Sequence, residues 1–217
     1  MSQGPRPSES APFLYRAAQA IIPRLWRWTG GSVRILGREH LPERGAALIL
    51  CNHLSYLDPI LLQSSIRRPI YALAKSTSFS APLTGPLMHR ICSFPVRRFQ
   101  VDPQATRVAL RHLRAGRLVA IYIEGERSWN ARLQEPKKGT VRLALKAGVP
   151  VIPCVIRGTY EVLPRWRKRL RPGPVTFQFM PPLPMPALHG RVHREPLVPE
   201  TARRIMDALR TETRPAD

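Results

Sequence analysis

The chain has 217 residues, which suits one globular domain with a short appended arm, and 43% of them are hydrophobic, which excludes a globally disordered chain. Lysine and arginine total 35 against 14 acidic residues, so the formal net charge is +21, and thirty of these basic residues are arginine. The planar guanidinium of arginine can form paired hydrogen bonds to phosphate oxygens. The predicted partner is therefore a polyanion: a nucleic acid, an anionic membrane face or a phosphorylated small molecule.

Residues 1–11 are polar and rich in proline and serine, which is typical of a disordered tail and not of a secretory signal. No apolar run reaches the roughly 18 residues that a membrane-spanning helix needs. Cys51, Cys92 and Cys154 are isolated in the sequence, which indicates neither a disulfide framework nor a paired-cysteine metal site. We therefore expect no metal site and a reducing compartment.

Apolar residues recur at helical spacing just after this tail, so residues 12–30 are predicted to form an amphipathic helix. Its apolar side consists of Leu14, Ala17, Ala18, Ile21, Leu25 and Trp28. Such a helix is suited to the headgroup layer of a membrane. The predicted membrane contacts are Leu14, Ile21, Arg24, Leu25, Trp26, Arg27 and Trp28. A helix packed on its own domain is an equal alternative, because surface helices carry similar stripes.

Beyond Gly31, short apolar runs alternate with helix-like stretches. The predicted strands are 46–51, 71–74, 118–123, 149–156 and 175–179, and the predicted helices are 103–115, 140–147 and 200–211. This alternation predicts a single α/β domain over residues 31–180, with a mostly parallel or mixed central sheet flanked by helices. Residues 181–217 are predicted to form a Pro-rich loop and a C-terminal helix.

The sharpest motif follows the first of these strands directly and reads Asn52-His53-Leu54-Ser55-Tyr56-Leu57-Asp58-Pro59. The carboxyl edge of a sheet is where α/β folds place ligands, and His53 and Asp58 can meet across a strand-to-helix turn. Helix capping is a structural alternative, with Ser55 and Asp58 forming a capping box, or Asp58 as the cap before Pro59. Capping explains neither Asn52 nor His53.

This run resembles the first motif of the glycerolipid acyltransferases, a family typified by the 1-acylglycerol-3-phosphate acyltransferases, in which it reads Asn-His-x-Ser-x-x-Asp-Pro. Three later segments resemble the other family motifs in the same order. They are Ala74-Lys75 with Gly85 and Phe94-Pro95-Val96-Arg97-Arg98, then Tyr122-Ile123-Glu124-Gly125-Glu126-Arg127-Ser128, and last Val149-Pro150-Val151-Ile152-Pro153. The chain departs from the pattern at Thr77, where the family has Glu, and at Ile123 and Glu126, where the third motif has Pro and Thr.

The resemblance implies an O-acyltransferase in which His53 is the general base and Asp58 orients its ring. Imidazole suits this role because its pKa lies near working pH, and the acceptor hydroxyl is itself the nucleophile. An acyl intermediate on Cys51 is conceivable, but a small apolar residue at the end of a strand explains that cysteine better. The resemblance also implies substrate contacts from Asn52, Ser55, Lys75, Arg98, Glu124, Gly125, Arg127 and Ser128.

Among these residues, Arg98 and Arg127 are expected to bind an acceptor phosphate through paired hydrogen bonds. Glu124 is expected to orient the acceptor or to pair with Arg127. The glycine at 125 would let the backbone approach closely, with amides facing the oxyanion. Glu126 adds a negative charge beside this pocket, which leaves the acceptor headgroup open.

The expected reaction transfers a fatty acyl group from acyl-CoA or acyl carrier protein (acyl-ACP) to the hydroxyl of a lysophospholipid. Lysophosphatidic acid is the first candidate, and lyso-ornithine lipid or another lysolipid is the alternative. No cofactor is expected, and the expected location is the cytoplasmic face of the inner membrane, on anionic lipid. A basic nucleic-acid-binding module would explain the charge but not residues 52–59, so no nucleic acid partner is expected. A non-catalytic lipid-binding relative is disfavoured by His53 and Asp58.

Overall fold

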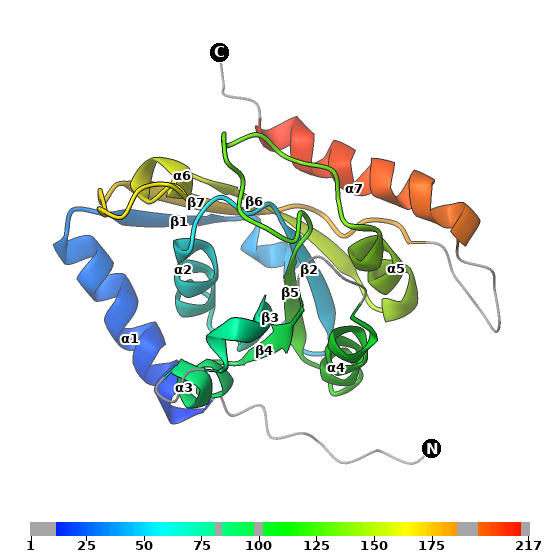
Figure 1. Cartoon of the computed structure of the whole chain (residues 1–217), viewed down its shortest axis with the longest axis horizontal. Helices are drawn as coiled ribbons and strands as arrows, with labels where there is room; N and C mark the ends of the chain where they lie inside the picture. Colours follow the sequence, from blue (N-terminus) through cyan, green and yellow to red (C-terminus); the bar gives the residue numbers. More distant parts are fainter. Residues whose placement is uncertain (1–11, 81–83, 98–101, 186–194, 214–217) are drawn as a thin grey trace.

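The computed structural model describes residues 12–80, 84–97, 102–185 and 195–213, and within these ranges seven strands form one sheet in the order β1-β7-β6-β2-β5-β3-β4 (Figure 1). The strands are β1 (Ser32–Leu36), β2 (Ala47–Cys51), β3 (Ile70–Lys75), β4 (Ser93–Val96), β5 (Leu118–Tyr122), β6 (Val151–Arg157) and β7 (Pro174–Phe179). The five strands β2 to β6 are mutually parallel, whereas β7 pairs antiparallel with β6 and parallel with β1. The predicted α/β domain with a mixed central sheet is confirmed.

Helices cover both faces of this sheet (Figure 1). The α-helices are α1 (Phe13–Trp28), α2 (Leu57–Ser65), α3 (Thr84–Arg90), α4 (Pro103–Arg114), α5 (Lys138–Ala147), α6 (Thr159–Val162) and α7 (Val198–Thr213). One core lies between the sheet and the α1–α2 side, and a second lies beneath α4, α5 and α7. Because both faces are covered, β2 and β5 are buried at every position, which is why they appear in the sequence as continuous apolar runs.

The five strands predicted from sequence are present, as are the three predicted helices. Asp102 caps α4 as its sequence indicates: one carboxylate oxygen accepts the amides of Gln104 (3.1 Å) and Ala105 (3.0 Å), and Pro103 is the first helical residue. Strands β1 and β4 and helix α3 were not predicted. All three are too short to show a clear apolar periodicity, and β4 is also interrupted by Pro95.

Helix α1 docks on its own domain through a face other than the predicted stripe. The hydroxyl of Tyr15 donates to the Gln63 carbonyl and accepts the Ile70 amide, both at 3.0 Å. Trp26 is only 7% exposed, and its indole nitrogen donates to the Ser32 carbonyl at 3.2 Å. The predicted membrane contact of Trp26 is therefore wrong, because this ring belongs to the core. A Cβ at Gly31 would lie 2.3 Å from the ring, so only glycine fits beneath it.

The predicted apolar stripe of α1 faces outward. Leu14 is 36% exposed, Ile21 53%, Leu25 55% and Trp28 85%. The alternative in which the helix packs on its own domain is thus confirmed for the face that carries Tyr15 and Trp26, and a second apolar face stays uncovered. None of the helices in the described ranges is both long and apolar enough to span a bilayer. The predicted tail, residues 1–11, lies outside the described residues.

Candidate active site

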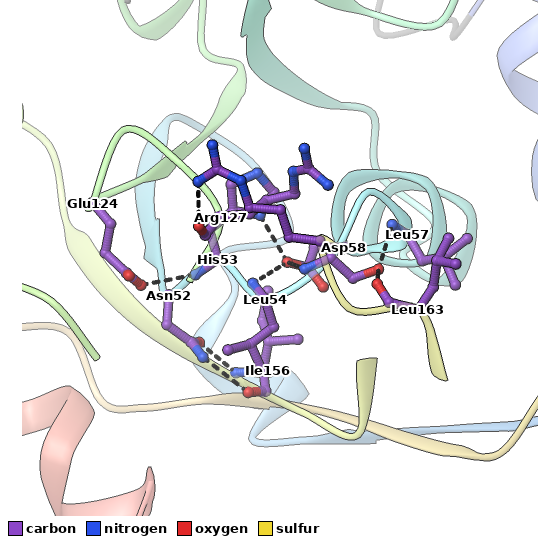
Figure 2. Close-up of polar contacts among 11 residues, drawn as sticks. Asn52, His53, Leu54, Leu57, Asp58, Glu124, Arg127, Ile156 and Leu163 are labelled. Atoms are coloured by element: carbon purple, nitrogen blue, oxygen red, sulfur yellow. Dashed lines mark hydrogen bonds and ion pairs between the residues drawn. The ribbon is translucent and has the colours of Figure 1, made fainter. Parts of the chain in front are cut away.

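The Asn52–Pro59 motif lies at the carboxyl edge of the sheet, where β2 ends between its neighbours β5 and β6. The chain leaves β2 at Cys51, turns through residues 52–56 and enters α2 at Leu57. Parallel strands bring their carboxyl ends to one edge, so the turn meets the loop that follows β5 and the end of β6. Figure 2 shows side chains from all three segments gathered around His53 and Asp58.

His53 and Asp58 form the predicted pair. The Nδ1 atom of His53 lies 2.8 Å from Oδ2 of Asp58, and the residues are 4% and 0% exposed. A carboxylate only accepts, so Nδ1 carries the proton in this contact, and in the neutral ring the lone pair is on Nε2. The same Oδ2 accepts the amides of Leu54 (2.7 Å) and Ser55 (2.9 Å), which fixes the carboxylate in the turn. This arrangement equips Nε2 to take a proton from a substrate hydroxyl.

The capping alternative is only partly present. The Ser55 amide donates to Asp58 as in a capping box, but Ser55 Oγ accepts the Leu57 amide at 3.2 Å and not the Asp58 amide, and α2 begins at Leu57 with Tyr56 as its cap. The Asp58 carboxylate therefore holds both the turn before α2 and the histidine. Ser55 Oγ itself donates to the Leu163 carbonyl at 2.7 Å and the residue is fully buried. The predicted substrate contact of Ser55 is wrong, since its hydroxyl is used to position the turn.

Asn52 extends the pairing of β2 with β6 by one side chain. Its Nδ2 donates to the Ile156 carbonyl at 3.0 Å, and its Oδ1 accepts the Ile156 amide at 2.7 Å (Figure 2). The side-chain amide thus takes the place of a backbone peptide, and the residue is 3% exposed. The predicted substrate contact of Asn52 is wrong for this reason. Asn52 instead sets the point at which the chain leaves the sheet and His53 turns into the site.

The loop after β5 forms hydrogen bonds with both the amide and the carbonyl of His53. Glu124 Oε1 accepts the His53 amide at 3.0 Å, and the Ser128 amide donates to the His53 carbonyl at 2.8 Å. Ser128 is fully buried, and its hydroxyl donates to the Arg132 carbonyl at 3.0 Å, so it builds the loop and does not contact substrate as predicted. Glu124 is 1% exposed, and burial is the main reason why its pKa rises to about 7.

Tyr122, the last residue of β5, was not predicted as part of the site. Its ring stacks on the His53 imidazole with the centroids 4.2 Å apart. Burial raises the pKa of its phenol well above the ordinary value, so the stacked ring stays neutral. Tyr122 is in register with Cys51, and this pairing brings it next to the motif. A sequence signal existed, because Tyr122 is the first residue of the third motif and lies near the end of the predicted strand 118–123.

Gly125 differs from its predicted role. It adopts a positive φ of 72°, which glycine tolerates best, and its amide donates to the Tyr122 carbonyl at 3.1 Å. That amide closes a turn, so it is not free to face an oxyanion, and an oxyanion contact from the other amides of this segment stays a prediction. The glycine still permits a close approach, since a Cβ would lie 3.2 Å from Lys137 Cγ.

The predicted anion-binding residues fall in three different situations. Arg127 is 9% exposed and its guanidinium carbon lies 3.4 Å from the centroid of the Tyr56 ring. Figure 2 shows Arg127 close to His53 and Asp58. Lys75 is exposed at the carboxyl end of β3, on the same edge of the sheet. Arg98 lies outside the described residues. The structure thus places Arg127 at the site and leaves Lys75 at its periphery.

A cleft of about 1130 Å³ opens beside this site, between α4 and α5. Tyr122 and Gly125 are among its lining residues, so the cleft reaches the ring that stacks on His53. Apolar side chains from the strand ends and helices form its floor, and basic side chains stand at its rim. They are Leu73, Val96, Leu110, Ile121 and Leu143 for the floor, and Arg97, Arg107, Lys137, Lys138, Arg142 and Lys146 for the rim. An apolar cleft with basic edges matches a substrate with a fatty chain and phosphate groups.

Comparison with known proteins places this geometry in a family. A family model described as Acyltransferase matches residues 32–157, which include His53, Asp58 and the loop after β5. The chain belongs to the acyltransferase family. It is 32% identical over 179 residues to a Chlamydomonas reinhardtii protein named 1-acyl-sn-glycerol-3-phosphate acyltransferase, covering 78% of this chain and 53% of that protein. A Limnanthes douglasii protein of the same name is 32% identical over 173 residues, covering 75% of this chain and 59% of the relative.

A solved structure of an acyltransferase also shares the fold. The crystal structure of the 1-acyl-sn-glycerophosphate acyltransferase PlsC from Thermotoga maritima superimposes with a TM-score of 0.72, covering 92% of this chain and 80% of the other, at 22% identity. The chain spans little more than half the length of the curated relatives named above. Family membership and fold are therefore established for this acyltransferase domain.

Proposed function

We propose that this chain is an O-acyltransferase that forms a diacyl phospholipid from 1-acyl-sn-glycerol-3-phosphate and an acyl thioester. The observation that carries the proposal is the buried His53–Asp58 pair, 2.8 Å apart, next to an apolar cleft with a basic rim. The relatives that carry the name 1-acyl-sn-glycerol-3-phosphate acyltransferase support the same acceptor. Acyl-CoA and acyl-ACP both fit the proposed donor role, and the reaction uses no cofactor.

In the proposed reaction the acceptor hydroxyl attacks the thioester carbonyl. His53 Nε2 takes the hydroxyl proton as the new C–O bond forms, and Asp58 stabilises the resulting imidazolium through Nδ1. The C–S bond then breaks, and the departing thiolate receives the proton from Nε2. No covalent acyl-enzyme is needed. The thiol of Cys51 is fully buried and burial raises its pKa, which argues against it as a nucleophile.

Arg127 is the proposed ligand for the acceptor phosphate, because it is the described arginine of the third motif and lies against the turn that carries His53. Its planar guanidinium can donate two parallel hydrogen bonds to phosphate oxygens. Arg98 and Lys75 remain proposed as further phosphate contacts.

We further propose that the chain works on an anionic membrane surface at the cytoplasmic face of the inner membrane. The exposed apolar stripe of α1 supports this, because four large apolar side chains face outward and Arg24 and Arg27 are exposed beside them. Apolar burial in the headgroup layer and attraction of the basic residues to anionic lipid would act together.

The test is an assay with one acyl thioester and a panel of lyso-acceptors, read by mass spectrometry of the lipid products. Wild-type chain is expected to acylate 1-acyl-sn-glycerol-3-phosphate. His53→Ala is expected to reduce turnover by roughly two to four orders of magnitude, because the hydroxyl loses its base, and Asp58→Asn by at least about 100-fold, because the tautomer is no longer fixed.

His40→Ala is the matched control. His40 follows β1, which runs opposite to β2, so it lies at the other edge of the sheet, and its removal is expected to leave turnover unchanged. Near wild-type transfer by His53→Ala would exclude the proposed chemistry. Product formed only from a different lysolipid would retain the chemistry and replace the acceptor.

A further inference from the structure

The loop that carries Arg127 is held from outside by a second segment, residues 160–167, which no family motif includes. The Tyr160 hydroxyl donates to the Trp129 carbonyl at 2.6 Å, and the indole of Trp166 donates to that hydroxyl at 3.3 Å. The guanidinium carbon of Arg165 lies 3.9 Å from the ring centroid of Trp129. Residues far apart in sequence therefore clamp the loop that follows Gly125.

Arg165 also forms an ion pair with this loop. Its Nη1 lies 2.8 Å from Glu126 Oε2, and the two side chains are 24% and 23% exposed. The same nitrogen donates to the backbone carbonyl of Arg127 at 3.2 Å. One guanidinium group thus neutralises the side chain of residue 126 and fixes the backbone of residue 127.

This contact bears on the residue at which the chain departs from the third motif. Glu126 stands where the family has threonine, directly beside Arg127 in the chain. An uncompensated carboxylate there would repel an anionic headgroup and offset the charge of Arg127, and the partial burial of the site strengthens such interactions. With Arg165 in contact, the three side chains carry one net positive charge instead of none.

We propose that Arg165 is a specificity-determining positioning residue, which neutralises Glu126 and holds Arg127 so that the loop favours acceptors bearing a phosphate monoester. This inference rests on the proposed function, because it concerns how the acceptor is selected. Arg165 acts through Glu126 and Arg127 and takes no part in proton transfer, so it is expected to affect KM and acceptor affinity and to leave kcat nearly unchanged.

The test is a double-mutant cycle on Arg165→Gln and Glu126→Thr, with KM and kcat for 1-acyl-sn-glycerol-3-phosphate and the Kd of the same lipid in detergent. Arg165→Gln is expected to raise KM and Kd about tenfold and to change kcat by less than about twofold. Adding Glu126→Thr to Arg165→Gln should return both constants to within about threefold of wild type, because no carboxylate is left to neutralise. Glu126→Thr alone should be close to wild type.

Two further variants give the cycle its controls. Arg167→Gln removes a neighbouring arginine that contacts Trp166 and the Glu161 carbonyl but not Glu126, and it should leave KM unchanged. Arg165→Lys keeps the positive charge and should stay within about threefold of wild-type KM, which also serves if Arg165→Gln fails to fold. A monoacylglycerol acceptor, which lacks the phosphate, should show no KM increase in Arg165→Gln.

The inference is overturned if the double variant binds the lipid as weakly as Arg165→Gln, or if Arg165→Lys raises KM tenfold. Binding that follows the cycle without any acyl transfer would support the inference and overturn the proposed reaction. Absence of binding by the wild-type chain would overturn both.

Discussion

Contacts to both the backbone and the ring of His53 fix its position. Its amide and carbonyl are bonded to the loop after β5, its Nδ1 to Asp58, and its ring face to Tyr122. These contacts come from the loop after β5, from the first turn of α2 and from the last residue of β5. The Nε2 atom is then the one polar group of the residue that these contacts leave for a substrate, which is the geometry that general-base catalysis requires.

Titration of the buried Glu124 carboxyl predicts how the stability of the chain depends on pH. Its pKa is raised to about 7, chiefly by burial, so the folded chain keeps this proton at pH values where the unfolded chain has lost it. Between about pH 4.5 and 7 the folded state therefore binds more protons, and this residue's contribution to stability falls as pH rises, by a total on the order of 3 kcal/mol. Glu124→Gln should remove that decline.

The measurement is urea unfolding of wild type and Glu124→Gln at several pH values. Glutamine keeps an acceptor oxygen for the His53 amide, so the two proteins differ mainly in the titrating proton. The difference in unfolding free energy should change steadily across this window and level off above it. Parallel pH profiles for the two proteins would contradict the prediction.

At the scale of elements, α1 presents two apolar faces with different tasks. Trp26 and Tyr15 attach the helix to the core, while Leu25 and Trp28 point away from it. Trp26→Ala is expected to lower the unfolding free energy by about 3–5 kcal/mol, because it leaves a cavity, whereas Trp28→Ala should change it by less than about 0.5 kcal/mol.

The outward face, which contributes little to unfolding stability, should matter for binding to lipid. Trp28→Ala combined with Leu25→Ala is expected to weaken binding to vesicles by roughly tenfold or more, since two side chains no longer bury in the headgroup layer. Sedimentation of the chain with vesicles measures the loss of lipid binding. Urea unfolding measures the changes in stability predicted for Trp26→Ala and Trp28→Ala. Unchanged vesicle binding in the double variant would show that the outward face is not a membrane contact.

The contrast within α1 shows what a single sequence can indicate. The outward stripe is the more apolar face, so periodicity selects it, whereas the docking face includes Tyr15 and Gln19, whose polar groups bond to backbone carbonyls of the domain. The strands β2 and β5 were predictable because full burial leaves continuous apolar runs. The His53–Asp58 pair was predictable from a local motif. The roles of Asn52 and Arg165 were not, because their partners lie 104 and 39 residues away.

At the scale of the whole molecule, a net charge of +21 sets the interaction with any anionic surface. Binding to vesicles that contain anionic lipid should weaken by tenfold or more as salt rises from about 0.05 M to about 0.5 M, because the Debye length shrinks from more than about 10 Å to a few ångströms. Vesicle sedimentation across a salt series measures this. Equal binding to zwitterionic vesicles at low salt would show that charge is not the cause.

The bond between Asn52 and Ile156 has a consequence for how the protein is made. During synthesis the first half of the site, including His53, leaves the ribosome before the strand that contains Ile156 exists. Contacts between residues so distant in sequence form late and slowly, since a long loop must close first. A nascent chain that stops short of β6 therefore carries the motif without a shaped site, and the proposed acyl transfer requires that the sheet has first closed around it.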